Sequence, residues 1–272
     1  MQALARHFDQ DTAFLLEPTQ SGADLRIRYF VPDHEMGISG HATIAAITVA
    51  LRMGTIRPGT TRVETVTGVF AVDSRKAGSS YLITLEQNSP EFRERADQHE
   101  TAHALGIDGT DTALEIGPIQ SVSASRPKLI VPLKSVVVLN ELKPDFEALW
   151  NLCDRKAVSG LYPFALPENG DVERPNARQF PLRAGFPEDP ATGVAAAALG
   201  AYLARYCLYY VAGRHQFLIS QGYAMGAPSQ ITAIVECSDY SIMRIAVQGA
   251  AKIVSQGSLD LDQLTTNTTT KG

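Results

Sequence analysis

Residues 188–203 read EDPATGVAAAALGAYL, so two acids and a Thr-Gly step lead directly into an alanine-rich apolar run. The pattern predicts a helix that begins just after Thr192, because threonine is a favoured N-cap residue and alanine is the strongest helix former. The first N–H groups of a helix have no partner inside it and carry the positive end of its dipole. The stretch therefore predicts an anion-binding helix start, at Thr192, Gly193 and Val194, beside the carboxylate of Asp189.

A second segment repeats this arrangement in the N-terminal part of the chain. Residues 39–46 read SGHATIAA and match TGVAAAAL at 192–199, with Gly40 in the place of Gly193 and two alanines shared. Two such helix starts can hold one carboxylate jointly. The alternative is that both are ordinary capped helices packed through their alanines. The repeat, spaced a little over half the chain apart, favours two similar halves.

The composition favours a small-molecule partner. The chain has 272 residues, 44% hydrophobic and 19% charged, which is typical of a globular protein. Its net charge of −5, with Lys and Arg scattered, argues against a nucleic-acid or anionic-membrane surface. No apolar run reaches the length of a membrane span and the N-terminus does not read as a signal peptide, so we expect a cytoplasmic protein.

No motif for a metal or a dinucleotide is present in the sequence. The three cysteines are widely separated and the histidines lack ligand spacing, so we expect no metal site. Ser39 lacks the Gly-x-Ser-x-Gly context of a nucleophilic serine, and no glycine-rich fingerprint for a dinucleotide follows a predicted strand. Acid/base chemistry is the remaining interpretation.

Strand and helix patterns alternate along the chain. Strands are predicted at 25–31, 62–66, 70–72, 81–85, 129–133 and 231–235, and helices at 1–8, 40–53, 98–105, 144–155 and 192–206. One long helix among several antiparallel strands in each half indicates an α+β fold of two barrels, each wrapped around a helix. The Pro- and Gly-containing stretch 106–118 is the expected linker.

The candidates for chemistry are the acids and the histidine near the two helix starts: Asp11, Glu35 and His41 in the N-terminal half, and Glu188 and Asp189 in the C-terminal half. The alternative for Glu35, and for Asp33 and His34 before it, is a solvated loop charge. Two acids can move a proton on a carbon next to a carboxylate, because one takes the proton and the other returns it. The helix-start N–H groups near Ser39 and Gly40 would stabilise the negative charge that develops. The plain alternatives are that Asp189 only complements a helix dipole and that His41 is structural.

The motifs SGHAT at 39–43, EDPATG at 188–193 and QGYAMGAPS at 221–229 together resemble the PhzF-like family of the diaminopimelate-epimerase-like superfamily, as do the segments at 129–133 and 158–162. The resemblance covers nearly the whole chain. It implies two pseudo-symmetric barrels around central helices, with a cofactor-free active site in the cleft between them, in a homodimer. It places His41 on the family's Gly-His histidine and Asp189 on its second catalytic acid.

The chain departs from the family pattern in several places. Asp11 stands where the family has a glutamate, with a shorter side chain. Val194 replaces a serine after Thr-Gly, and Ser39 stands where racemases of the superfamily carry a cysteine, so chemistry with two thiols is not expected. Relatives also carry a strand and a Gly-Asn-Pro turn ahead of the helix at 1–8, so the first barrel is expected to lack its N-terminal strand.

The resulting prediction is a cofactor-independent isomerase or epimerase acting on a small carboxylate-bearing metabolite. Its domains are predicted as an N-terminal half at 1–112 completed by about 250–262, a C-terminal half at 118–249, and a disordered tail at 263–272. Two alternatives stay open. One is an inactive homologue that binds a small anion or serves as a scaffold, and the other is a lyase or hydrolase that uses the same acids.

Overall fold

The computed structural model describes residues 1–8 and 10–259, and its contacts divide the chain into two units. Unit 1 comprises Met1–Ile83 and the chain from Ala250 onward, and unit 2 comprises Thr84–Gly249. The predicted tail at 263–272 lies outside the described residues.

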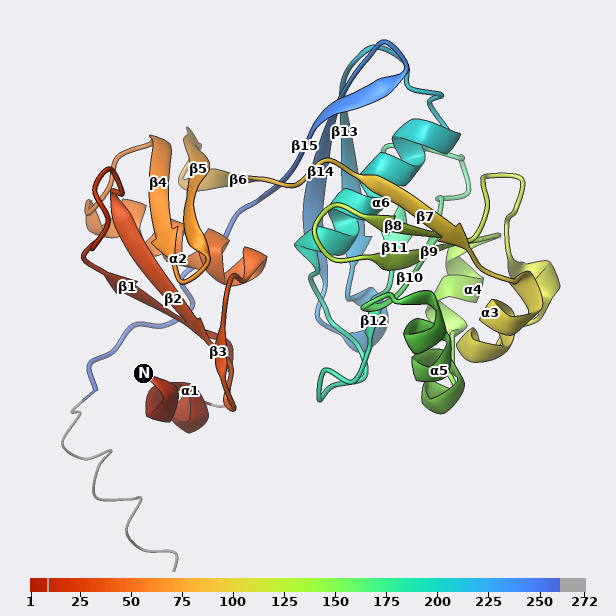
Figure 1. Ribbon diagram of the computed structural model, residues 1–272, viewed down its shortest axis with the longest axis horizontal. Coiled ribbons are helices and arrows are strands. Elements are labelled where there is room, and N and C mark those ends of the chain that lie inside the picture. Colours follow the sequence, from red (N-terminus) through yellow and green to blue (C-terminus); the bar gives the residue numbers. More distant parts are fainter. Residues whose placement is uncertain (9, 260–272) are drawn as a thin grey trace, which may run out of the picture. The chain divides into compact units, whose positions relative to one another are not determined.

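Unit 1 consists of a twisted sheet and one long helix (Figure 1). The strand order is β1-β2-β4-β5-β6, with β3 paired to β2, so β1 is the outer strand. Its elements are α1 (Gln2–Phe8), β1 (Thr12–Leu16), β2 (Leu25–Phe30), β3 (Glu35–Met36), α2 (Gly40–Met53), β4 (Gly59–Thr65), β5 (Gly68–Ala77) and β6 (Ser80–Glu86), which crosses the boundary between the units.

The core of unit 1 follows from the alternation of side chains in β2. Leu25, Ile27 and Tyr29 are buried, whereas Arg26 and Arg28 between them are partly exposed. Period-2 alternation of this kind buries one face of a sheet. The buried face packs against α2, on which Ala46, Ile47 and Ala50 are buried.

Unit 2 is built around α6 (Gly193–Tyr206), which is fully buried from Ala195 to Ala204. Its sheet has the order β6-β15-β14-β13-β11-β10-β9-β8-β7, with β12 paired to β10. Its strands are β7 (Glu91–Arg95), β8 (Gln120–Ser123), β9 (Lys128–Leu133), β10 (Gly160–Ala165), β11 (Asn176–Ala177), β12 (Phe180–Pro181), β13 (Gly213–Gln221), β14 (Ser229–Ser238) and β15 (Ser241–Gly249). The other helices are α3 (Gln98–Leu105), η1 (Gly109–Asp111), α4 (Val136–Glu141), α5 (Phe146–Lys156) and η2 (Tyr223–Met225).

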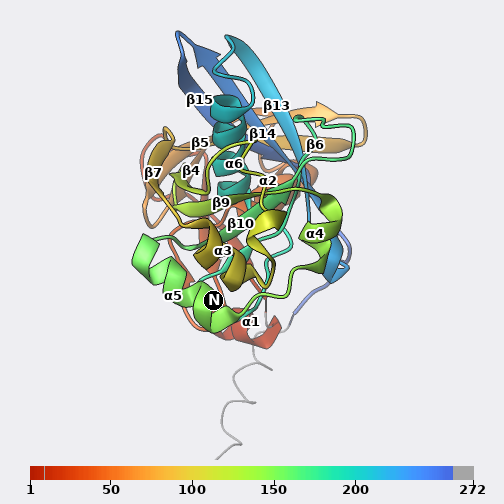
Figure 2. The same cartoon turned by 90° about the vertical axis from the view of Figure 1, so that its right-hand side faces the viewer.

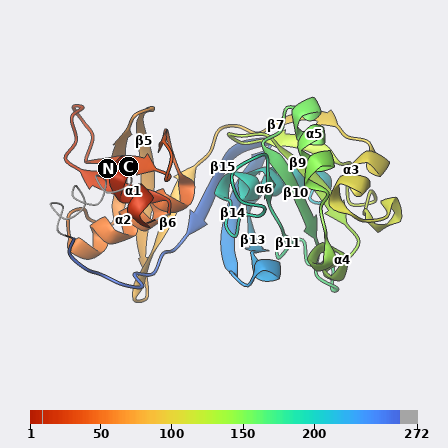
Figure 3. The ribbon, with the colours of Figure 1, turned by 90° about the horizontal axis from the view of Figure 1, so that it is seen from below.

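The sheet of unit 2 curves around α6. The helix lies along the long strands β13, β14 and β15 (Figure 2), and it also contacts β8 and β9. At Gly200 a Cβ atom would stand 2.9 Å from the Cβ of Ala233, so the helix approaches β14 closely only because this residue is glycine. On the other side of β9 and β10, helices α3, α4 and α5 cover a second apolar cluster that includes Leu129, Leu149 and Leu161 (Figure 3).

The predicted α+β class is confirmed, since most strand pairs are antiparallel and each unit holds one 14-residue helix. Among the strand pairs of the described residues, three are parallel: β2 with β4, β9 with β10, and β11 with β13. The five predicted helices are present within two residues of their expected ends. Helix α4 was not expected, because three consecutive valines favour a strand. Ser135 starts it by accepting a hydrogen bond from the N–H of Val138 at 3.2 Å.

The division between the units differs from the predicted one at 112–118. Residues 84–118 belong to unit 2 because β7 pairs with β8 and α3 packs on α5. Within the expected linker, Gly106 ends α3 with φ 71°, and the carbonyl of Pro118 accepts a hydrogen bond from Tyr202 at 2.9 Å. This stretch is therefore packed structure. Residues 250–259 group with unit 1 and form no strand within that range.

Candidate active site

The predicted helix start in unit 1 is present at the N-terminus of α2. Ser39 is the N-cap residue, in extended conformation and 7% exposed, and its side chain makes no capping hydrogen bond. Its carbonyl instead accepts from both the N–H and the hydroxyl of Thr43, at 2.9 and 2.6 Å. The Thr43 hydroxyl also lies 2.6 Å from that of Tyr29. These bonds fix the first turn of α2, at Gly40, without using a serine hydroxyl as the cap.

Two of the predicted catalytic residues meet at this helix start. The Nε2 atom of His41 lies 3.0 Å from Oδ2 of Asp11, which directly precedes β1. Their side chains are 54% and 35% exposed, so both are open to solvent. Despite its short side chain, Asp11 therefore reaches the histidine at the start of α2. An imidazole beside a carboxylate can pass a proton to it or hold it in place.

The predicted helix start in unit 2 is present at the N-terminus of α6. Thr192 is the N-cap residue in extended conformation, and again its side chain makes no capping hydrogen bond. Its hydroxyl donates instead to Oδ2 of Asp189 at 2.6 Å, while Oδ1 accepts from the N–H of Ala191 at 3.2 Å. Gly193 and Val194 in the first turn are partly exposed, whereas the turns that follow are buried. This helix start thus presents uncapped N–H groups beside a fixed carboxylate.

Gln221 joins the segments around Asp189. Its side-chain N–H donates to the carbonyl of Asp189 at 2.6 Å and to the hydroxyl of Thr192 at 3.1 Å. Its carbonyl oxygen accepts from the hydroxyl of Tyr162 at 2.8 Å. Burial, and then the negative charge of Asp189, raise the pKa of the Tyr162 phenol, so it remains a donor. In the sequence, Gln221 was noted only as part of the motif at 221–229. Nothing in the neighbouring residues indicates that the end of β13 will reach the loop that carries Asp189.

Two further contacts hold the Asp-Pro-Ala segment. The hydroxyl of Ser229 donates to the carbonyl of Pro190 at 2.6 Å. Gly222 has φ +79°, and a Cβ there would lie 2.2 Å from the carbonyl oxygen of Ala227. Only glycine fits this turn.

Glu188 is not available for chemistry. Its carboxylate forms a two-pronged ion pair with Arg178, with distances of 3.0 and 2.8 Å, and both residues are 9% exposed. The remaining guanidinium nitrogen of Arg178 donates to the carbonyls of Leu139, Asn140 and Leu142 at the end of α4. Of the two acids ahead of α6, Asp189 is the one with an exposed face.

The predicted site residues therefore form two groups. Asp11, Ser39, Gly40 and His41 lie together in unit 1, whereas Asp189, Thr192, Gly193 and Val194 lie together in unit 2. Within the described residues, no cluster of three His, Cys, Asp or Glu side chains has the geometry of a metal site. No helix in that part of the chain is both long and apolar enough to cross a membrane.

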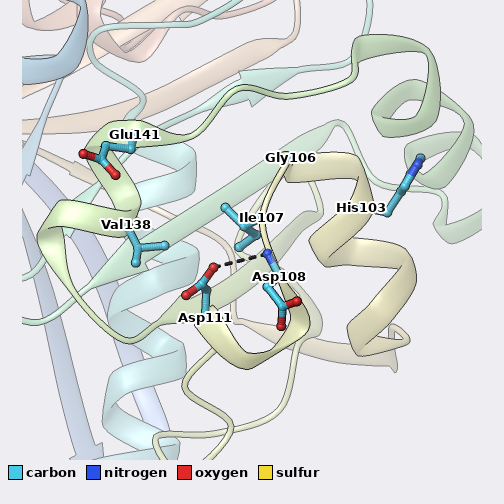
Figure 4. A pocket seen from close by; sticks show the side chains of 7 residues that line it. All are labelled: His103, Gly106, Ile107, Asp108, Asp111, Val138 and Glu141. Carbon is cyan, nitrogen blue, oxygen red and sulfur yellow. Dashed lines mark hydrogen bonds between the residues drawn. The ribbon is translucent and has the colours of Figure 1, made fainter.

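A hollow in unit 2 contains none of these residues. It measures about 540 Å³ and is lined by His103, Gly106, Ile107, Asp108, Asp111, Val138 and Glu141 (Figure 4). Asp111 accepts from the N–H of Asp108 at 3.2 Å, and Asp108 accepts from Thr110, so both aspartates close the turn at η1. The carboxylates there serve the local turn.

The chain is similar to proteins that are named as isomerases. A family model described as phenazine biosynthesis-like protein matches residues 1–257. An uncharacterized isomerase of Clostridium acetobutylicum is 31% identical, covering 96% of this chain and 88% of the relative. A trans-2,3-dihydro-3-hydroxyanthranilate isomerase of Pseudomonas aeruginosa is 30% identical, covering 94% and 87%. A crystal structure of a PhzF-family protein of Bacillus anthracis has a TM-score of 0.82 at 25% identity, covering 93% and 88%.

The chain belongs to the phenazine biosynthesis-like PhzC-PhzF family. The predicted family and fold are thereby confirmed.

Proposed function

We propose that this protein is a cofactor-independent isomerase that moves a proton on a small carboxylate-bearing substrate. The main support for this proposal is that each unit places a carboxylate at the start of its long helix. In addition, the side chain of the Ser or Thr N-cap residue at that helix start makes no capping hydrogen bond. Such N–H groups are well suited to bind an anion. The family relatives, which are named as isomerases, support the same reaction class.

In the proposed reaction, Asp189 and Asp11 are the acid/base groups. One carboxylate takes a proton from a substrate carbon, so that a C–H bond breaks and an O–H bond forms, and the other carboxylic acid returns a proton to a different position. His41 holds Asp11 or relays its proton. The N–H groups at Gly40 and His41 and at Gly193 and Val194 bind the substrate carboxylate as charge develops. The protein is further proposed to act as a cytoplasmic homodimer.

Turnover in deuterium oxide tests this proposal. The panel should contain amino acids, cyclohexadienyl carboxylic acids, and the dihydro-hydroxyanthranilate named for the Pseudomonas aeruginosa relative. We expect deuterium to enter a substrate carbon, and Asp189→Asn to slow this by about 10²- to 10⁴-fold, the usual contribution of an acid/base group.

Asp239→Asn is the matched control for this measurement. Asp239 is exposed in the β14–β15 turn at φ 50°, a conformation that asparagine tolerates. This variant should exchange deuterium like the parent. If the folded parent exchanges none across the panel but still binds a carboxylate, the protein is a non-catalytic anion-binding homologue instead.

A further inference from the structure

Gln179 carries a buried side-chain amide that has no partner. The residue lies between β11 and β12 and is 1% exposed, and neither its Oε1 nor its Nε2 atom makes a hydrogen bond with any residue that the structure describes. Such an amide has an acceptor oxygen and two N–H donors to satisfy. Unpaired polar groups destabilise a protein interior, and where a native protein keeps one it points to a functional group or to a bound partner. The amide of Gln179 is therefore a candidate contact for a ligand.

Gln179 is the direct neighbour of Asp189. The backbone carbonyl of Gln179 accepts from the N–H of Asp189 at 3.0 Å, and the two residues form an isolated antiparallel bridge. Residues directly opposite each other in an antiparallel pair place their side chains on the same face. The side chains of Gln179 and Asp189 therefore lie on one face. Asp189 is partly exposed there and Gln179 is buried, so Gln179 stands at the deeper end of the candidate site.

This face is the one on which α6 begins. The register of β10 with β12 places Tyr162 opposite Gln179. The hydroxyl of Tyr162 donates to the side chain of Gln221, which in turn donates to the hydroxyl of the N-cap residue Thr192 at 3.1 Å. Gly160, two residues before Tyr162, leaves room for the amide, because a Cβ atom there would stand 2.5 Å from Nε2 of Gln179. The unpartnered amide and the uncapped start of α6 thus lie on the same side of the sheet.

We propose that Gln179 binds a hydroxyl or amino substituent of the substrate, while the N–H groups at the start of α6 bind its carboxylate. This inference rests on the proposed function, in which Asp189 exchanges a proton with the same molecule. A primary amide both donates and accepts hydrogen bonds, which matches a hydroxyl or amino group and not a hydrocarbon chain. The substrate class is therefore a small carboxylic acid with such a substituent. Gln179 selects for it because an analogue without the substituent leaves the buried amide unpaired.

Binding measured without turnover tests this assignment. The probes are benzoate, 2-aminobenzoate and 3-hydroxybenzoate, titrated calorimetrically into the parent, Gln179→Met and the control Gln216→Met. Methionine is similar to glutamine in length and volume but lacks the amide, and Gln216 is exposed on β13. We expect the parent to bind a substituted acid about 10-fold more tightly than benzoate, as one buried hydrogen bond allows. Gln179→Met should bind the three acids equally, whereas Gln216→Met should keep the preference. A parent without this preference, or a folded Gln179→Met that keeps it, would overturn the proposal.

A second measurement needs no ligand. In the free protein, Gln179→Met replaces an unpaired buried amide by an apolar side chain of similar size, so it should unfold at a higher urea concentration than the parent. The same or a lower midpoint would show that the amide is already paired without a ligand, and would contradict the proposal.

The binding test also separates this inference from the proposed function. A preference that is lost in Gln179→Met, together with no deuterium exchange by the parent, would retain the binding role of Gln179 and reject the isomerase function. Deuterium exchange by the parent together with an unchanged preference in Gln179→Met would reject only the binding role.

Discussion

At the scale of single residues, the candidate site includes two N-cap residues whose side chains make no capping hydrogen bond. Ser39 and Thr192 occupy N-cap positions, but the hydroxyl of Thr192 is used to hold Asp189, and Ser39 acts through its carbonyl. The N–H groups that such side chains normally bind are left for another acceptor. A local choice of hydrogen-bond partner therefore distinguishes these two helix starts from ordinary caps.

Lys128, the buried first residue of β9, should reduce stability at neutral pH. Burial lowers its pKa from 10.5 to about 8, so below pH 8 the folded state bears the full cost of the buried charge, about 3 kcal/mol. As the pH rises from 8 to 10.5 the unfolded state binds more protons than the folded state, so the cost disappears. We expect urea denaturation to show Lys128→Met more stable than the parent at pH 7, with the difference shrinking towards pH 10.5. An equal advantage at both pH values would contradict this assignment.

The carboxylate of Asp11 should be required for deuterium exchange into the substrate. Asp11→Asn removes the charge beside His41, and we expect deuterium exchange to fall by about 10²-fold or more. Asp11→Glu keeps the carboxylate on a longer side chain, so exchange should remain measurable. The control is Asp73→Asn, at an exposed position of β5. If Asp11→Glu loses as much exchange as Asp11→Asn, the exact position of the carboxylate matters more than its negative charge.

At the scale of elements, the start of α6 is held by segments that are distant in the sequence. Gln221 at the end of β13 binds the Asp189 carbonyl, and Ser229 at the start of β14 binds the Pro190 carbonyl. Arg178 links Glu188 to the carbonyls that end α4. The loop before α6 is therefore held by hydrogen bonds from β13, from β14 and from Arg178 between β11 and β12.

Breaking the Arg178–Glu188 pair should destabilise unit 2. Arg178→Met leaves a buried carboxylate without its partner, and we expect a loss of about 3–5 kcal/mol in the free energy of unfolding. In the double variant Arg178→Met, Glu188→Met no charge remains buried, so much of this loss should be recovered. Chemical denaturation of the two variants and the parent measures the difference. A double variant less stable than Arg178→Met would show that the pair itself is strongly favourable.

At the scale of the whole molecule, each unit holds one predicted acid beside the start of its long helix. This duplication is consistent with the repeat seen between residues 39–46 and 192–199. The boundary at Ile83–Thr84 assigns β7 and α3 to the unit that holds Asp189. The two units therefore differ in size although their central helices are equally long.

The protein should form a homodimer in solution. The family resemblance implies this state, and light scattering at micromolar concentration should give twice the chain mass of 29.4 kDa. Because obligate interfaces are more apolar than the rest of a surface, the mass should be insensitive to salt. A mass of one chain at every concentration would contradict the prediction.

Much of the fold and part of the site could be predicted from local patterns. The starts of α2 and α6 follow from Ser-Gly and Thr-Gly ahead of alanine runs, and β2 follows from its alternation. Those signals are read within a few residues, because caps and side-chain periods are local properties. Helix α4 was missed because the Ser135 cap outweighs the strand preference of three valines.

The sequence by itself therefore determined the α+β class, the family, and the acids that stand beside each central helix. Tertiary structure decided which acid is free and which is paired, since Glu188 and Asp189 are adjacent in the chain but only Glu188 meets Arg178. It also brought His41 to Asp11 and Gln221 to the segment that carries Asp189. Such partners come from distant strands and turns, so their charges and hydrogen bonds exist only once the sheets have closed around the helices.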